Sequence, residues 1–211
     1  MKLKQPLAGL IHLFGAVLSV PALVALIILG GNSAWKIVSF SIYGASLLLL
    51  FTFSVLYHWL PQEAGGRLQI FRKLDHLAIY FMIAGTYTPF CLVTMRGGWG
   101  WTIFGLIWGM AAIGIITQSI YINVARWLTT TIYICMGWLI LLAFKPLMMV
   151  LPIGGIGWLI AGGIIYSIGG VMYTTKKPNL NPVFGYHELW HSLVLLGAAC
   201  HYIAILLYVA L

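Results

Sequence analysis

Long apolar segments, separated by short polar connections, set the pattern of this chain. Each segment approaches the roughly 20 residues that an α-helix needs to cross a bilayer, and none shows the short alternation of a membrane β-barrel. The segments are residues 9–29, 37–60, 74–95, 99–118, 127–144, 151–173 and 186–209. The pattern therefore predicts an all-α membrane protein in which residues 1–211 form a single bundle of seven transmembrane helices.

The composition agrees with a membrane protein and excludes several other classes. Hydrophobic residues make up 62% of the chain and charged residues 7%, whereas soluble domains carry roughly a quarter charged residues. This balance excludes a soluble enzyme, a disordered protein and a coiled coil. The net charge of +8 comes from basic residues in the short connections, which suits contact with anionic lipid headgroups. We therefore expect membrane lipids as partners and no binding of nucleic acid.

The distribution of basic residues predicts the orientation in the membrane. With the N-terminus in the cytoplasm, eight basic residues fall inside and three outside. They are Lys2, Lys4, Arg67, Arg72, Lys73, Arg126, Lys176 and Lys177 against Lys36, Arg96 and Lys145. Because basic residues are enriched in cytoplasmic loops, we expect a cytoplasmic N-terminus and an external C-terminus in the plasma (inner) membrane.

Ionisable residues within the apolar segments gather at one side of the predicted bundle. Such residues are costly in a membrane, so each is a candidate for function. They are His12, His58, Asp75, His76, His187, Glu188 and His191, with His201 deeper in the seventh segment. Helix direction puts all of them except His201 near the same face, which the charge count makes the cytoplasmic face.

Three of these histidines have the spacing of a metal site. His187 and His191 are four residues apart and share a helix face, and His58 would add a third nitrogen from another helix. Three His ligands and one water make an open zinc site, which lowers the pKa of that water to about 7. Asp75 could orient the water or accept its proton. Ser54, four residues before His58, could donate a hydrogen bond nearby.

Structural roles are the alternative for the remaining candidates. His12 and His76 are expected to be polar residues at the membrane interface, and His201 to be packed or hydrogen-bonded within the bundle. Asp75 could instead pair with one of the basic residues at positions 72 and 73.

Two other metal sites match parts of the pattern. His187 and His201 are fourteen residues apart, as in b-type cytochromes, but the other histidines form no second pair with that spacing. The string from His187 to His191 also matches H-E-x-x-H, in which Glu188 would be the general base of an intramembrane metalloprotease. Such a protease normally takes a third ligand from a later segment, where only His201 follows, so this alternative is less favoured.

The ordered motifs resemble the haemolysin III branch of the progestin and adipoQ receptor (PAQR) family. The matching stretches are S-V-L-Y-H at 54–58, L-D-H at 74–76, A-G-T-Y-T-P-F at 84–90, H-E-L-W-H at 187–191 and C-H-Y at 200–202. The resemblance implies a zinc near the cytoplasmic face, with His58, His187 and His191 as ligands. It also implies that Asp75 lies beside the zinc-bound water and Ser54 close to the ligands. Relatives are associated with ceramidase-like lipid hydrolysis, membrane-lipid homeostasis and haemolysis.

These observations predict a zinc-dependent hydrolase that cleaves a lipid amide or ester, with Asp75 as base and Ser54 at the catalytic centre. The first alternative is a receptor or signalling membrane protein in which the zinc is structural. The second is a cytolysin that perturbs membranes, although the sequence has no amphipathic basic segment that would insert from solution.

Overall fold

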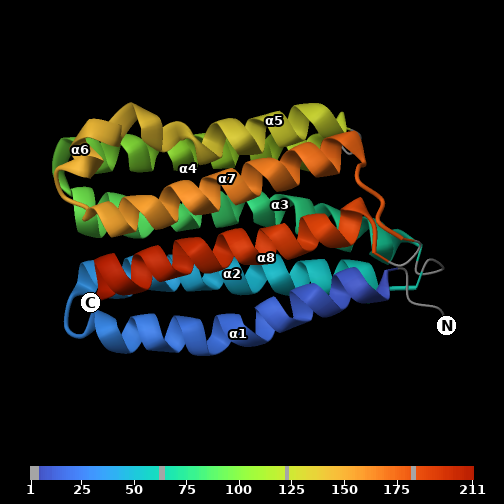
Figure 1. The fold of residues 1–211 in the computed structure, drawn as a ribbon, viewed down its shortest axis with the longest axis horizontal. Helices are drawn as coiled ribbons and strands as arrows, with labels where there is room; N and C mark the ends of the chain where they lie inside the picture. Colours follow the sequence, from blue (N-terminus) through green and yellow to red (C-terminus); the bar gives the residue numbers. More distant parts are fainter. Residues whose placement is uncertain (1–4, 62–64, 122–123, 182–183) are drawn as a thin grey trace.

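The protein is a bundle of long helices that share one long axis (Figure 1). The computed structural model describes residues 5–61, 65–121, 124–181 and 184–211. The helices are α1 (Pro6–Gly30), α2 (Ala34–Trp59), α3 (Gly66–Pro89), η2 (Phe90–Met95), α4 (Gly97–Ile120), α5 (Arg126–Gly137), η3 (Leu139–Ala143), α6 (Phe144–Met148), α7 (Ile153–Thr175), α8 (Tyr186–Ile205) and η4 (Leu206–Ala210). Within these described residues, seven helical segments are long and apolar enough to cross a membrane. The predicted seven-helix, all-α membrane fold is therefore confirmed.

Local sequence explains where several of the helices begin. Pro6 opens α1, where its missing N–H costs nothing because the first turn of a helix has no internal acceptor. The Ser33 hydroxyl caps α2 by accepting a hydrogen bond from the Lys36 backbone N–H at 3.4 Å. At the start of α8, the Glu188 carboxylate accepts from the Gly185 backbone N–H at 3.0 Å.

Helix α3 begins at Gly66, earlier than the predicted start at residue 74. The added turns carry Arg67, Arg72 and Lys73, which the apolar pattern had assigned to a connection. Hydropathy marks only the part of a helix that lies in hydrocarbon, and polar turns can continue beyond it into the headgroup region. The Lys73 ammonium donates to the carbonyl of Ser119, near the end of α4, and this contact holds the extended part of α3 against its neighbour.

The fifth membrane segment is not one regular helix, although the sequence predicts it as such. It divides into α5, η3 and α6 around Gly137 and Trp138. The Tyr87 hydroxyl of α3 lies 2.9 Å from the Met136 carbonyl and 2.7 Å from the Gly137 carbonyl, to which it donates. It also accepts from the Ile140 backbone N–H at 3.0 Å. Broken helices in a membrane require such replacement partners for their backbone groups.

Helix α8 lies against α7 on one side and against α1 on the other, and α1 lies in turn against α2 (Figure 1). One core cluster joins these helices to α3, and a second joins α3, α4 and α5. Large buried side chains of the clusters include Phe40, Tyr43, Phe51 and Ile205 in the first and Tyr80, Ile103, Ile107 and Met136 in the second. Large apolar residues such as Ile113 and Val24 are exposed on the outside, as expected for surfaces that face lipid tails.

Candidate metal centre

Three histidines from two helices converge at the end of the bundle where α2 ends and α8 begins. His58 lies in the last turn of α2, and His187 and His191 lie in the first two turns of α8. Each offers one ring nitrogen, and these nitrogens all lie within 4.8 Å of one another. The Nε2 atoms of His187 and His191 are 3.1 Å apart. His58 and His191 are almost fully buried.

This arrangement fits a divalent ion such as zinc. Ligand nitrogens at 2.0–2.1 Å from a tetrahedral zinc are about 3.4 Å from one another, so the His187–His191 pair already has nearly that separation. The third nitrogen, on His58, lies within 4.8 Å of the other two. A buried hydroxyl also lies close in sequence: Ser54, one turn before His58, is fully buried, and its Oγ has no hydrogen-bond partner within the described residues. Three His residues that could hold a metal ion are thus brought together as the sequence predicts.

Asp75 lies in α3 and is buried, with 6% of its surface exposed. Together with His12 and His191, it lines a cavity of about 650 Å³ between α3, α5, α7 and α8. Its carboxylate does not belong to the three-residue group that could hold a metal. The structure therefore puts Asp75 beside the cavity that His191 reaches, where it could act on a bound molecule without being a ligand. Its catalytic role stays a prediction.

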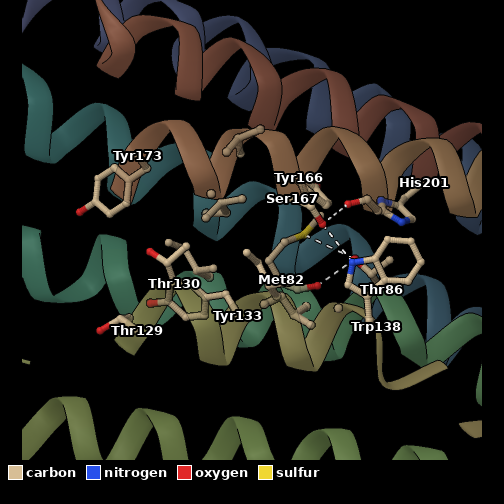
Figure 2. A pocket seen from close by; sticks show the side chains of 18 of the residues that line it. Met82, Thr86, Thr129, Thr130, Tyr133, Trp138, Tyr166, Ser167, Tyr173 and His201 are labelled. Carbon is tan, nitrogen blue, oxygen red and sulfur yellow. Dashed lines mark hydrogen bonds between the residues drawn. The ribbon is translucent and has the colours of Figure 1, made fainter. Parts of the chain in front are cut away.

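The cavity continues from this end into the bundle, and its wall becomes mostly apolar with a few polar groups (Figure 2). Trp138 donates from Nε1 to the Ser167 hydroxyl at 3.0 Å. The His201 ring stacks on Tyr166 with centroids 5.3 Å apart, and its Nδ1 lies 3.0 Å from the Gly197 carbonyl. His201 is thus packed and hydrogen-bonded within the bundle, as expected. A cavity of this size and character is typical of small-molecule sites.

His12 is buried inside the bundle and contacts one of the three histidines. It is 3% exposed, and its Nε2 lies 2.9 Å from Nδ1 of His191. Gln5, which no sequence argument selected, holds its Oε1 at 2.7 Å from Nδ1 of His58. A single His or Gln near a helix start has no spacing that identifies it, so only the packing of α1 on the other helices reveals these contacts. His76 is half-buried, and its carbonyl accepts from the Tyr133 hydroxyl at 3.0 Å.

Sequence comparisons bear directly on these residues. A family model described as "Haemolysin-III related" matches residues 2–202. The chain belongs to the haemolysin III-related family. Hemolysin-3 of Bacillus cereus is 43% identical over 209 residues, which cover 98% of this chain and 92% of that protein. The Hemolysin-3 homolog of Bacillus subtilis (strain 168) is 41% identical over 209 residues, covering 98% and 95%. The Monocyte to macrophage differentiation factor of Homo sapiens is 31% identical over 198 residues, covering 90% and 79%.

The resemblance drawn from the motifs is thereby confirmed, and this haemolysin III-related chain is a multi-pass membrane protein. The geometry also bears on the H-E-x-x-H alternative. One oxygen of Glu188 caps α8 through the Gly185 N–H at 3.0 Å, and His58, the third member of the cluster, comes from an earlier helix. Both features differ from the arrangement expected of a metalloprotease.

Proposed function

We propose that this haemolysin III-related protein is a zinc-dependent hydrolase of lipid amides or esters. The observation that carries the proposal is the three-histidine cluster, one member of which, His191, lines a large cavity between the membrane-spanning helices. Three neutral His ligands leave one position of a tetrahedral zinc open, which is the ligand set of catalytic zinc sites rather than closed structural ones.

Each polar residue of the centre has a role in this proposal. Zinc held by His58, His187 and His191 would supply Lewis acidity toward a carbonyl oxygen and a hydroxide nucleophile near neutral pH. Asp75 lines the cavity that His191 reaches, and its carboxylate would take a proton from the nucleophile and return it to the leaving group. The buried Ser54 hydroxyl would donate a hydrogen bond within the centre.

The cavity supports a lipid substrate. It lies between helices whose outer faces are apolar, and most of its deeper lining residues are apolar or aromatic. A long-chain lipid could therefore leave its hydrocarbon tail in an apolar environment while its amide or ester bond lies at the polar end, near His191 and Asp75.

We also propose that the metal centre faces the cytoplasm. Helix direction puts six of the eight basic residues of the predicted inner side at the end where the histidines lie, and the other two, Lys2 and Lys4, lie outside the described residues. The plasma (inner) membrane is the proposed location.

Metal analysis and a turnover assay on the same preparation test the function. Protein purified without chelator should hold about one zinc per chain, by the open three-His argument, and should cleave a long-chain lipid amide or ester in nanodiscs. His58→Ala should lose both the zinc and the cleavage. Preparations that hold no zinc would refute the proposal.

Two outcomes would favour the other candidates. If the parent binds zinc but cleaves no lipid, and His58→Ala loses that zinc, a receptor or signalling protein with structural zinc is favoured. The name Hemolysin-3, carried by the Bacillus cereus relative, raises membrane lysis as a further candidate. Dye release from liposomes by the parent and by His58→Ala alike would favour that activity.

A further inference from the structure

The first turns of α1 are fixed to the end of α2 beside the histidine cluster. The Gln5 backbone N–H donates to the His58 carbonyl at 3.1 Å, and the Trp59 indole N–H donates to the Pro6 carbonyl at 3.1 Å. The Trp59 ring lies directly on Gly9, where an added Cβ would be 2.2 Å from the ring. Only glycine permits this close approach, so the sequence brings α1 against α2 at this point.

The side chain of Gln5 determines which nitrogen of His58 carries its proton. Its Oε1 is 2.7 Å from His58 Nδ1, and a carbonyl oxygen can only accept a hydrogen bond. Nδ1 of His58 is therefore the donor, and Nε2 carries the lone pair. This is the tautomer that a metal ligand coordinating through Nε2 requires.

His12 is the hydrogen-bond partner of another of the three histidines, His191. The Nε2 of His191 lies toward His187 at 3.1 Å, while its Nδ1 lies 2.9 Å from the Nε2 of His12. When His191 coordinates through Nε2, its proton is on Nδ1 and is donated to His12. The His12 ring is itself fixed edge-on against Phe51, with centroids 5.1 Å apart. A buried and immobilised acceptor thus faces the outer nitrogen of His191.

We propose that Gln5 and His12 are positioning residues, which set the tautomer and ring orientation of two metal ligands. The N-terminal turns of α1 then belong to the metal centre, although they contribute none of its three ligands. The inference rests on the proposed zinc site. Loss of an outer hydrogen-bond partner of a ligating histidine typically weakens metal binding by about 10–100-fold.

Two matched pairs of variants in the full-length protein separate hydrogen bonding from packing. His12→Phe keeps a ring but removes the acceptor, whereas His12→Gln can present an amide oxygen near the position of Nε2. Gln5→Leu removes the acceptor for His58, whereas Gln5→Glu supplies a stronger one. Zinc affinity is measured by competition with a chelator, and the ligand geometry by the visible spectrum of the cobalt(II)-loaded protein. We expect His12→Phe and Gln5→Leu to weaken binding by about 10–100-fold and to change the cobalt spectrum, and the other two variants to stay close to the parent.

Trp59→Phe is the structural control, because it removes the hydrogen bond to Pro6 while no ligand is touched. It should retain zinc affinity. A loss as large as that of His12→Phe would show that docking of α1, rather than the ligand contacts, matters and would overturn the inference. If His12→Phe lacks a cooperative thermal transition, the Gln5 pair decides, because Gln5 is only partly buried at the start of α1.

The design also separates this inference from the proposed function. Suppose the parent binds zinc, and His12→Phe and Gln5→Leu bind it within about threefold of the parent's affinity. That change is well below the loss expected when a ligating histidine loses its hydrogen-bond partner, and only the inference is then overturned. A parent that binds no zinc overturns the proposed function itself.

Discussion

Exchanging Asp75 and Glu188, one at a time, tests the chemistry most directly. Asp75→Asn keeps the size of a buried side chain that is 6% exposed, so no cavity is created, but the amide cannot accept a proton. Loss of a general base typically lowers the rate by about 10²–10⁴-fold, or about 2.7–5.4 kcal/mol in the activation barrier. Zinc should be largely retained, because Asp75 is not in the group of three that could hold the metal.

Glu188→Gln is the matched comparison. The glutamine retains an oxygen that can accept from the Gly185 N–H, which the Glu188 carboxylate does at 3.0 Å. Only the interaction of the negative charge with the N-terminus of α8 is lost, which is worth about 0.3–1 kcal/mol. Even if this whole energy appeared in the barrier, the rate would fall only about two- to fivefold.

The assay is cleavage of a long-chain lipid amide or ester in nanodiscs, with zinc measured on each variant. An inactive Glu188→Gln beside an active Asp75→Asn would refute the assignment and restore the metalloprotease reading. If Asp75→Asn, Glu188→Gln and His58→Ala all equal the parent at a background rate, the protein is not a zinc hydrolase.

Three further predictions follow from the packing and the charge pattern. Gly9→Ala forces its Cβ into the Trp59 ring and should weaken zinc binding by about tenfold through displacement of α1, whereas Gly105→Ala, with nothing within 4 Å, should leave the zinc affinity unchanged. Tyr87→Phe should lower the free energy of unfolding in detergent by about 1–3 kcal/mol, because two carbonyls and one N–H lose a buried partner; an unchanged denaturant midpoint contradicts this. A reporter fused after Leu211 should lie outside the cytoplasm and one fused after residue 177 inside it, and the reverse result would put the metal centre on the outer face.

The sequence predicts the membrane fold well because the lipid environment imposes the same requirement on every helix that crosses it. Each helix that crosses hydrocarbon must be apolar over nearly its whole length, so the segments can be found without knowing how they pack. The division of the fifth segment is different. It depends on the Tyr87 hydroxyl of α3, whose acceptors at positions 136 and 137 lie about fifty residues away in sequence. No local pattern records such a contact.

The candidate site likewise contains some residues that the sequence predicts and others that only the packing of the helices reveals. His187 and His191 are recognisable because four residues make one helical turn, and helix direction alone brings His58 to the same end of the bundle. Gln5 and His12 are not recognisable, since their contacts depend on the close approach of α1 to the helices that carry the ligands. The sequence therefore predicts the residues that could hold the metal, and the tertiary packing adds those that hold the ligands.

The H-E-x-x-H string has an explanation that needs no protease chemistry. Gly185 is the N-cap of α8, which makes His187 the second residue of the helix and Glu188 the third. The third position is where an acidic side chain can reach back to the N-cap N–H, and where a negative charge interacts favourably with the helix N-terminus. The two histidines are one turn apart because both face His58. Two independent requirements, the start of a helix and a pair of converging histidines, thus produce the motif at one place, and Glu188→Gln is expected to satisfy both.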